Sequence, residues 1–494
     1  MYTFIVCLIC LVAGYFVYGK IVEKIVEPDA ERTAPCYAMR DGVDYIPMPT
    51  WKVFLIQFLN IAGTGPIFGT ILGLLYGPAA YFWIVFGCIF GGAVHDYISA
   101  MISLKRNGAS LPEIIGDELG NTARITQRVL ALLLMIMVVA VFVKTPAGLL
   151  NNMTGDIGSM NGYWFWVVII FAYYLLAATL PVDKIIGKVY PFFGVVLLFM
   201  VVCLFFGIFI NNTGNLPEIN EAFANHNPIS GDLPLFPGIC ITIACGAVSG
   251  FHATQSPMMA RCLKSERYGR RVFYGAMIVE GIVALVWATA TLQFASNLTG
   301  VEGDTPYARI YNAMYDPATS SVNPGLLVNK LCNDWLGTTG AVLAILGVVI
   351  APITTGDTAM RCARLISADI FKIKQNKVIM RLLLCLPVFV ISSVLLFVKF
   401  DVLWHYFSWF NQTFSIFTFF AITVYLAKLH KPYIISLIPG MFMVCVCVTY
   451  ICVDHSSLDL GEQLSNLVGI ACAIATGVWF VAWRHKFISK TSKL

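Results

Sequence analysis

Long apolar runs separated by short polar connections occupy almost the whole chain. Each run approaches the length of roughly 20 residues that an α-helix needs to cross the hydrocarbon core of a bilayer. The pattern predicts about thirteen membrane-spanning helices, at residues 2–20, 53–76, 79–104, 127–144, 162–180, 187–210, 236–257, 271–297, 338–356, 378–398, 404–428, 432–452 and 465–484. We therefore predict an all-α polytopic membrane protein.

The composition supports this class and excludes a soluble enzyme. Of the 494 residues, 58% are hydrophobic and 12% are charged, whereas soluble domains carry about 25% charged residues. The sequence has no P-loop motif, so ATP-driven transport would need another subunit. The first run lacks a positively charged start, which favours a retained helix over a signal peptide. We expect the lipid bilayer and a small-molecule substrate as partners, and no nucleic acid.

The positive charges alternate between the two sides of this predicted topology. One side collects 28 of the 32 Lys and Arg residues, and the other collects Lys144, Arg309, Lys330 and Lys399. The positive-inside rule places the charge-rich side in the cytoplasm. The N-terminus is therefore predicted outside and the C-terminus inside. The linker 20–52 is then cytoplasmic, and the long connection 298–337 is external.

Two of the apolar runs contain residues that interrupt a helix. The second run carries Gly63, Thr64, Gly65 and Pro66 at its middle, and Pro removes a backbone donor. In lipid such a break is costly unless other groups satisfy the freed backbone. The seventh run contains a comparable set of polar and flexible residues, which includes Ser249, Gly250, His252 and Gln255. A glycine-rich packing surface and a simple loop are the alternative interpretations of the two segments.

The positions of the two breaks indicate an internal repeat. Runs two to six and runs seven to eleven form two groups of five that start from opposite sides, and each group begins with an interrupted helix. This is the pattern expected of inverted repeats whose broken helices meet near the membrane midplane. The predicted divisions are residues 1–50, 51–212, 213–430 and 431–494. We expect the substrate site at Gly63, Thr64, Gly65, Ser249, Gly250, His252 and Gln255.

The ninth run offers a candidate cation site. Thr354 and Thr355 supply hydroxyl oxygens and Asp357 supplies a carboxylate. These oxygens, facing unwound carbonyls near Ala62, would suit a sodium ion. A protonatable Asp357 would serve proton coupling instead, and a plain ion pair with Arg361 is the structural alternative.

Ionisable residues within the apolar runs form a further set. His95 and Asp96 lie in the third run and Glu280 in the eighth, where buried charges are expensive and suggest function. Asp96 and His252 are candidates for proton transfer or substrate pairing. Glu280 could equally pair with Arg270 or Arg271.

Five motifs resemble those of the carbon starvation protein A (CstA) family. They are DGVDYIPMPTW (41–51), FLNIAGTGPIFGTILG (58–73), GGAVHDY (91–97), SGFHATQSPMMAR (249–261) and PITTGDTAMRCARL (352–365). The resemblance runs from near residue 2 to about residue 400. It implies a multi-pass carrier of the bacterial inner membrane, made during carbon starvation and associated with uptake of peptides and of pyruvate.

The resemblance also implies a LeuT-type fold related to the amino acid–polyamine–organocation carriers. Such a fold agrees with a five-plus-five core that has one extra helix before it and two after it. We therefore expect a symporter that imports short peptides or small carboxylates by alternating access, with Na⁺ or H⁺ as the coupling ion and no other cofactor. A channel is one alternative. A membrane-embedded enzyme using His95, Asp96 and His252 is another, although no HExxH-type ligand spacing supports it.

Overall fold

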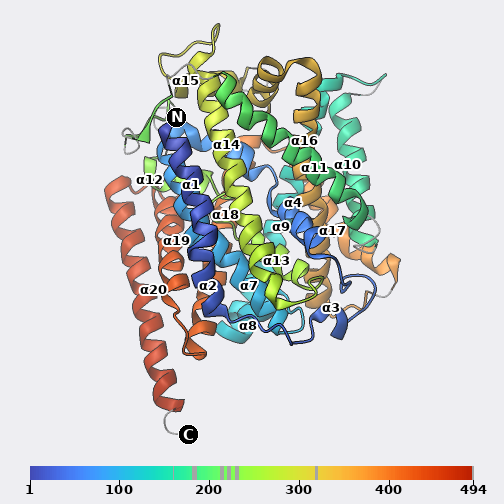
Figure 1. Cartoon of the computed structure of the whole chain (residues 1–494), viewed down its shortest axis with the longest axis vertical. Coiled ribbons are helices and arrows are strands. Elements are labelled where there is room, and N and C mark those ends of the chain that lie inside the picture. Colours follow the sequence, from blue (N-terminus) through green and yellow to red (C-terminus); the bar gives the residue numbers. More distant parts are fainter. Residues whose placement is uncertain are drawn as a thin grey trace.

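Helices that run nearly parallel make up most of the molecule (Figure 1). The computed structural model describes residues 1–158, 161–180, 186–211, 216–219, 224–228, 233–317, 321–375 and 377–491. In these ranges eleven helices are long and apolar enough to cross a membrane, or twelve if a bent pair counts as one span. The seventh predicted run adds two further short helices. These elements together confirm the predicted all-α polytopic architecture.

The elements before the second break come in the predicted order. They are α1 (Tyr2–Phe16), α2 (Tyr18–Val26), α3 (Pro35–Ala38), α4 (Thr50–Ile61), η1 (Gly65–Gly69), α5 (Thr70–Gly73), η2 (Leu74–Tyr76), α6 (Ala79–Phe86), η3 (Gly87–Gly92), α7 (Ala93–Lys105), α8 (Leu111–Leu119), α9 (Asn121–Thr154), α10 (Gly162–Thr179), α11 (Ile186–Ile210) and α12 (Leu235–Thr242).

The remaining elements follow the second break. They are α13 (His252–Ala260), η5 (Glu266–Tyr268), η6 (Arg270–Tyr274), α14 (Gly275–Asn297), α15 (Pro306–Met314), β1 (Tyr315–Asp316), β2 (Ser321–Val322), α16 (Pro324–Phe371), α17 (Val378–Leu395), α18 (Phe400–Lys428), α19 (Ile434–Val453) and α20 (Glu462–Thr491). The connection predicted as an external loop thus contains α15, the β1–β2 hairpin and the start of α16.

Two helices are longer than the apolar runs that predicted them. α9 has 34 residues, because a helix can continue past the hydrocarbon into polar sequence. α16 has 48 residues, but its backbone is not helical at Gly337 (φ 62°, ψ 179°), so two helices meet there, and the second one continues past the end of the ninth run. α9 even runs through Pro146, which cannot donate to the carbonyl of Phe142. The Tyr174 hydroxyl donates to that carbonyl at 2.7 Å instead, so a neighbouring helix satisfies the group that proline frees.

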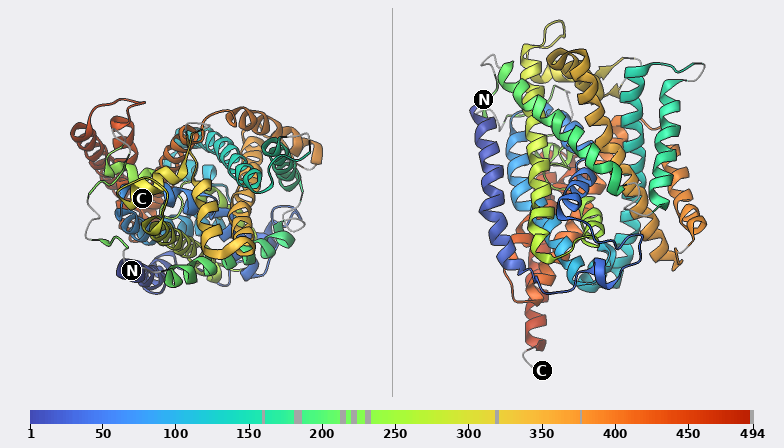
Figure 2. Two further views of the ribbon diagram at one scale, coloured as in Figure 1. Left: turned by 90° about the horizontal axis from the view of Figure 1, so that it is seen from above. Right: turned by 45° about the vertical axis from the view of Figure 1, so that its right-hand side comes forward.

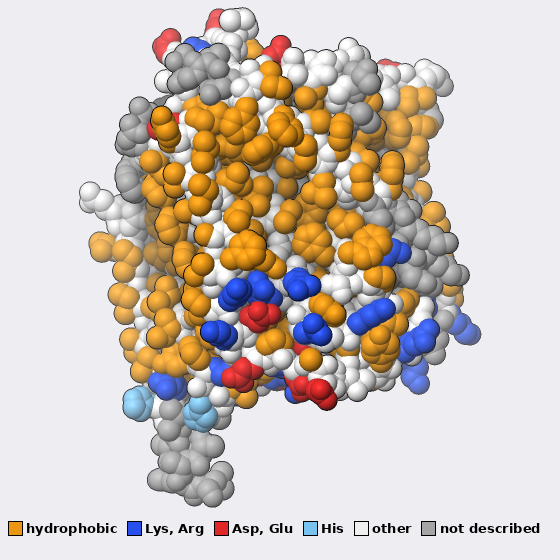
Figure 3. All heavy atoms as spheres, viewed as in Figure 1, with side chains coloured by type: hydrophobic (Ala, Val, Ile, Leu, Met, Phe, Trp, Pro, Cys, Tyr) orange, Lys and Arg blue, Asp and Glu red, His pale blue; other side chains and the backbone are white. Residues whose placement is uncertain are grey.

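The two ends of the bundle differ in charge. The N-terminus and α15 lie at one end, and the C-terminus, α3 and α8 lie at the other (Figures 1 and 2). In Figure 3, Lys and Arg side chains gather toward the end with α3 and α8, below a broad hydrophobic face. The positive-inside rule makes that end cytoplasmic, and the orientation remains a prediction.

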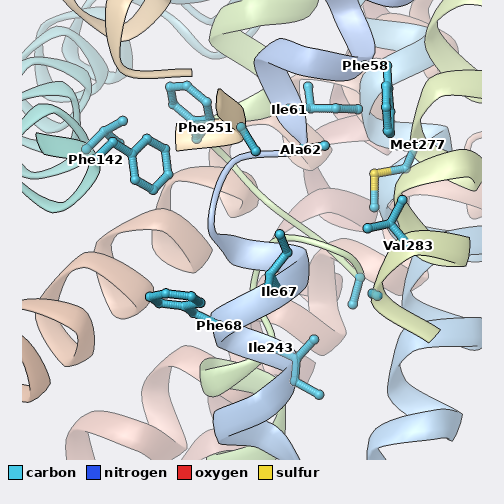
Figure 4. Close-up of a cluster of buried hydrophobic side chains, with 14 of the residues drawn as sticks. Phe58, Ile61, Ala62, Ile67, Phe68, Phe142, Ile243, Phe251, Met277 and Val283 are labelled. Atoms are coloured by element: carbon cyan, nitrogen blue, oxygen red, sulfur yellow. The ribbon is translucent and has the colours of Figure 1, made fainter. Parts of the chain in front are cut away.

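The two predicted breaks are present. α4 ends at Ile61 and is bent by 52° from the segment Gly65–Tyr76. α12 and α13 are separated by residues 243–251, which are not helical. Figure 4 shows how large apolar side chains surround the first break, with Phe58 and Ile61 on one side of it and Ile67 and Phe68 on the other.

Candidate functional site at two crossed helix breaks

The two breaks touch each other. A methyl group placed on Gly65 would lie 2.1 Å from Cβ of Cys245 and 2.6 Å from its sulfur. No side chain could occupy that space, so glycine is what lets the backbone of the first break approach the second. The predicted residues Gly63, Thr64 and Gly65 are all buried there.

The first break exposes a carbonyl to α16. In a continuous helix the amide of Gly63 would donate to the carbonyl of Leu59, but here it donates to Ile61 at 2.9 Å. The Leu59 carbonyl lies 3.1 Å from the hydroxyl oxygens of both Thr354 and Thr355. Three oxygens therefore converge at the C-terminal, partially negative end of α4, which favours a cation.

The hydroxyl hydrogens need not point at this group of oxygens. Thr354 lies 2.8 Å and Thr355 lies 3.1 Å from the carbonyl of Ala351 in their own helix. If each hydroxyl donates to Ala351, its lone pairs remain free for a ligand beside Leu59. The predicted pair of threonines thus faces the break, and its carbonyl partner is Leu59 rather than Ala62.

Asp357 faces a different set of groups. Its carboxylate accepts hydrogen bonds from Tyr190 at 2.6 Å, from Tyr173 at 2.7 Å and from Thr358 at 3.0 Å. The structure therefore places this carboxylate toward α10 and α11 and away from the Leu59 carbonyl. The alternative in which Asp357 pairs with Arg361 is wrong, because Arg361 is paired elsewhere.

Arg361 and Arg364 bind Asp44, a residue of the linker that precedes α4. The distances to its two oxygens are 3.0 and 3.3 Å. The same guanidinium groups donate to carbonyls at the C-terminal end of α10, including that of Ala178 at 2.9 Å. Burial raises the pKa of the Asp44 carboxyl, but the nearby arginine charges outweigh burial and hold that pKa below its usual value. The linker is thereby attached to α10 and α16.

Asn411 of α18 holds the second break in place. Its side-chain oxygen accepts from the amide of Phe251 at 2.7 Å, and its side-chain nitrogen donates to Ser249 at 3.0 Å. A methyl group on Gly250 would lie 2.3 Å from the Asn411 carbonyl, so glycine permits this approach as well. Sequence reasoning missed Asn411, although an Asn–Gln pair within an aromatic run is a detectable signal.

His95, Asp96, His252 and Glu280 come together beside the second break. Asp96 lies 2.9 Å from Nδ1 of His95 and 3.1 Å from Nδ1 of His252. Nε2 of His252 lies 3.7 Å from Glu280. The alternative in which Glu280 pairs with Arg270 or Arg271 is therefore wrong, and Arg270 instead binds Glu23 at 2.8 Å.

A cavity of about 800 Å³ opens at the end of the bundle that carries α3 and α8. It reaches Thr254 on α13 and Cys362 on α16, and Arg261 and Tyr45 also line it. The predicted residue Gln255 lies next to its inner end, because its amide nitrogen donates to the hydroxyl of Thr254 at 2.9 Å. A separate cavity of about 330 Å³ at the opposite end is lined by Thr242, Trp404 and His405, among other residues. The buried breaks lie between these two groups of residues along the broken helices.

Solved structures identify the class of fold. A Na⁺-coupled sialic acid symporter, in a substrate-bound outward-open state, aligns with a TM-score of 0.56 at 13% identity and covers 95% of this chain and 96% of its own. MhsT in complex with L-phenylalanine aligns with a TM-score of 0.54 at 12% identity and covers 86% of this chain and 99% of its own. The chain has the LeuT-type fold of these transporters, as its five-plus-five arrangement predicts.

The family model described as carbon starvation protein CstA matches residues 1–161 and 152–301. The chain therefore belongs to the CstA family. An uncharacterized membrane protein of Haemophilus influenzae is 45% identical in an alignment of length 341 that covers 60% of this chain and 92% of that protein. Because its relatives are bacterial and its fold is that of a membrane transporter, this chain is a multi-pass protein of the bacterial cytoplasmic membrane.

Relatives with assigned names are longer. The peptide transporter CstA of Bacillus subtilis is 29% identical in an alignment of length 347 that covers 58% of each protein. The pyruvate/proton symporter BtsT of Escherichia coli is 28% identical in an alignment of length 351 that covers 58% of this chain and 49% of the symporter. The chain spans about half the length of these two relatives.

Proposed function

We propose that this protein is a cation-coupled secondary transporter that imports a small carboxylate or a short peptide by alternating access. The observation that carries the proposal is the contact of the two helix breaks at Gly65 and Cys245. Broken helices that meet inside a bundle offer backbone groups to a ligand in a place where lipid would otherwise forbid them.

The substrate carboxylate would bind at the second break. The N-terminus of α13 carries a partial positive charge, which suits an anion. Ser249, Gly250 and His252 lie at this terminus, and Gln255 follows one turn later. Gly65, which follows Gly63 and Thr64 in the first break, contacts Cys245 of the second break. Pyruvate and peptides both present a carboxylate, which agrees with the names of the two relatives.

The coupling cation has three candidate places. The Leu59 carbonyl with the hydroxyls of Thr354 and Thr355 suits a metal cation such as Na⁺. The buried carboxylates of Asp357 and Asp96 suit a proton. No cofactor besides the coupling ion enters the proposal.

Alternating access would open the two ends of the site in turn. The larger cavity reaches α13 from the end with α3 and α8, and under the predicted orientation it opens to the cytoplasm. Toward the other end the aromatic rings of Phe142 and Phe407 lie 6.0 Å apart, centroid to centroid, and the rings of Phe68 and Phe400 lie 6.3 Å apart. This conformation would thus release substrate inward and exclude it from outside.

Uptake by the purified protein in liposomes tests the proposal. Labelled pyruvate and labelled dialanine are supplied with a Na⁺ gradient or a pH gradient imposed separately, and exchange is measured with equal substrate on both sides. A carrier exchanges label and accumulates one of these probes under one of the gradients. Thr355→Ala should weaken Na⁺-driven uptake if Na⁺ binds at Leu59, whereas Thr355→Ser keeps the oxygen and should retain it.

Three other outcomes would refute the proposal. Unitary currents without saturable exchange would show a channel. Chemical conversion of the solute that depends on His95, Asp96 and His252 would show a membrane enzyme. If the protein neither exchanges nor accumulates either probe, the proposed substrate class is wrong.

A further inference from the structure

Four titratable side chains from three helices form a continuous buried cluster, which we call the carboxylate–histidine cluster. His95 and Asp96 belong to α7, His252 is the first residue of α13, and Glu280 belongs to α14. Each of the four side chains has 0% of its surface exposed. The cluster adjoins the break at which the substrate carboxylate is proposed to bind.

The cluster is ordered as a chain with a carboxylate at each side of His252. Asp96 lies within hydrogen-bond distance of both histidine rings. An ionised Asp96 accepts from Nδ1 of both rings, and this fixes Nε2 of His252 toward Glu280. The 3.7 Å between Nε2 and the Glu280 oxygen exceeds a hydrogen bond, so this end of the chain is less tightly paired than the Asp96 end.

Glu280 is the member of the cluster whose charge is least compensated. Among the described residues neither Glu280 oxygen nor Nε2 of His252 makes a hydrogen bond of good geometry. The backbone amide of Gly246 lies near the Glu280 carboxylate and partly stabilises its charge. In the part of the chain that the structure describes, the titratable groups that face Glu280 are His252, Asp96 and the thiols of Cys245 and Cys88, and no Lys or Arg is among them. Burying a carboxylate charge with so few partners is costly, so Glu280 is the member of the cluster best suited to bind a proton.

We propose that the carboxylate–histidine cluster carries the coupling proton, that Glu280 is the group that binds it, and that His252 links it to the substrate. This inference rests on the proposed transport function. Glu280 takes one proton from the water of one compartment, its carboxylate becomes a carboxylic acid, and it releases the proton to the other compartment. No electron transfer or bond to substrate is involved.

The position of His252 explains how the proton and the substrate would be coupled. A substrate carboxylate at the N-terminus of α13 adds a negative charge within the same buried region. Two uncompensated anions raise each other's energy in low dielectric, so substrate binding favours protonation of Glu280 and protonation favours substrate binding. One proton would accompany each substrate carboxylate.

The same atoms also permit a second interpretation. Donor atoms of Cys245, His252 and Glu280 lie within 4.8 Å of one another, and Cys, His and carboxylate are ligands of transition metals. A bound metal would remove the free proton site, so metal content belongs in the test. The Asp96 carboxylate behind His252 is compatible with either role.

The test compares Glu280→Gln with the wild type in liposomes, with labelled pyruvate as the probe. The variant should exchange pyruvate across the membrane and lose accumulation driven by a pH gradient. Glu280→Asp keeps a carboxyl group and should recover part of that accumulation. Glu462→Gln, an exposed position on α20, is the control and should behave as wild type. A pH-indicator dye with detergent-solubilised protein should report proton uptake when pyruvate is added to the wild type and none with Glu280→Gln.

Several results would overturn the inference. Accumulation by Glu280→Gln that still follows the pH gradient would exclude Glu280 as the proton site. One equivalent of metal in the dialysed wild type, lost in Cys245→Ser and in Glu280→Gln, would replace the proton site by a metal site. If accumulation by the wild type does not depend on the pH gradient, proton coupling is refuted, whereas the proposed transport function is not. Absence of exchange and accumulation in the wild type would refute the proposed function and this inference together. If Glu280→Gln loses thermal stability, the dye measurement on Glu280→Asp and His252→Gln replaces it as the test of this inference.

Discussion

Replacing Gly65 by alanine tests whether the two helix breaks are in contact. The added methyl group would lie 2.1 Å from Cβ of Cys245 and 3.3 Å from its Cα, whereas carbon atoms pack at about 3.5–4.0 Å. The backbones of the two breaks would have to separate by more than 1 Å, roughly the difference between these distances. The clash involves atoms at and next to the backbone, which cannot rotate away as the end of a flexible side chain can.

Gly65→Ala should lower the free energy of unfolding by about 3 kcal/mol, which is the upper end of the usual cost of overpacking. Thermal unfolding of the detergent-solubilised protein, followed by tryptophan fluorescence, should show a clear decrease in Tm. Pyruvate exchange in liposomes should decrease as well, because the separated breaks no longer form one site. Gly148→Ala is the matched control, since a methyl group there meets no atom within 4 Å. It should leave stability unchanged or raise it slightly, because alanine favours a helix over glycine.

A second substitution makes the test specific to the contact. Cys245→Gly removes both atoms that clash and leaves its Cα at 3.3 Å. The double variant Gly65→Ala with Cys245→Gly should therefore be more stable than the sum of the two single effects predicts. Additive effects, or a Gly65→Ala variant as stable as Gly148→Ala, would refute the contact of the breaks and the site built on it.

Three further predictions concern the groups around the site. Asn411→Ala leaves the buried amide of Phe251 without its 2.7 Å acceptor and should cost about 1–3 kcal/mol in the free energy of unfolding, whereas Asn466→Ala on α20 should change the Tm little. Tyr190→Phe removes the 2.6 Å hydrogen bond to Asp357 and should lower the Tm, but Tyr163→Phe should not, because the Tyr163 hydroxyl has no hydrogen-bond partner among the described residues. Asp44→Asn should cost about 3 kcal/mol by breaking the buried pair with Arg361 and Arg364. Since the pKa of Asp44 is lowered in the folded protein, the charge stabilises the fold above the ordinary aspartate pKa, and this stability is lost as the pH falls through the lowered value. The Tm difference between wild type and Asp44→Asn should therefore be full at neutral pH and shrink in acid; an equal difference throughout would contradict the ion-pair explanation.

The sequence by itself determined the class of fold, the order of the helices and the positions of the breaks. A bilayer accepts only apolar helical segments of limited length, so composition alone locates them. Gly63–Pro66 and the polar residues at 249–257 cannot continue such a helix without compensation, and they identify the break in each five-helix group. The ends of α9 and the C-terminal end of α16 were not predicted, because these helices continue where the apolar run stops.

Which side chains meet inside the bundle was decided only by the tertiary structure. Asp44 binds Arg361, and Asn411 accepts a hydrogen bond from Phe251. Glu280 lies beside His252 rather than beside the arginines that are nearer in sequence. Helical periodicity states which residues share a face, but it does not state which helix that face will meet. In a bundle whose helices are all apolar, that choice depends on how small residues let backbones approach and on where buried polar groups find partners. These are properties of pairs of residues far apart in the chain.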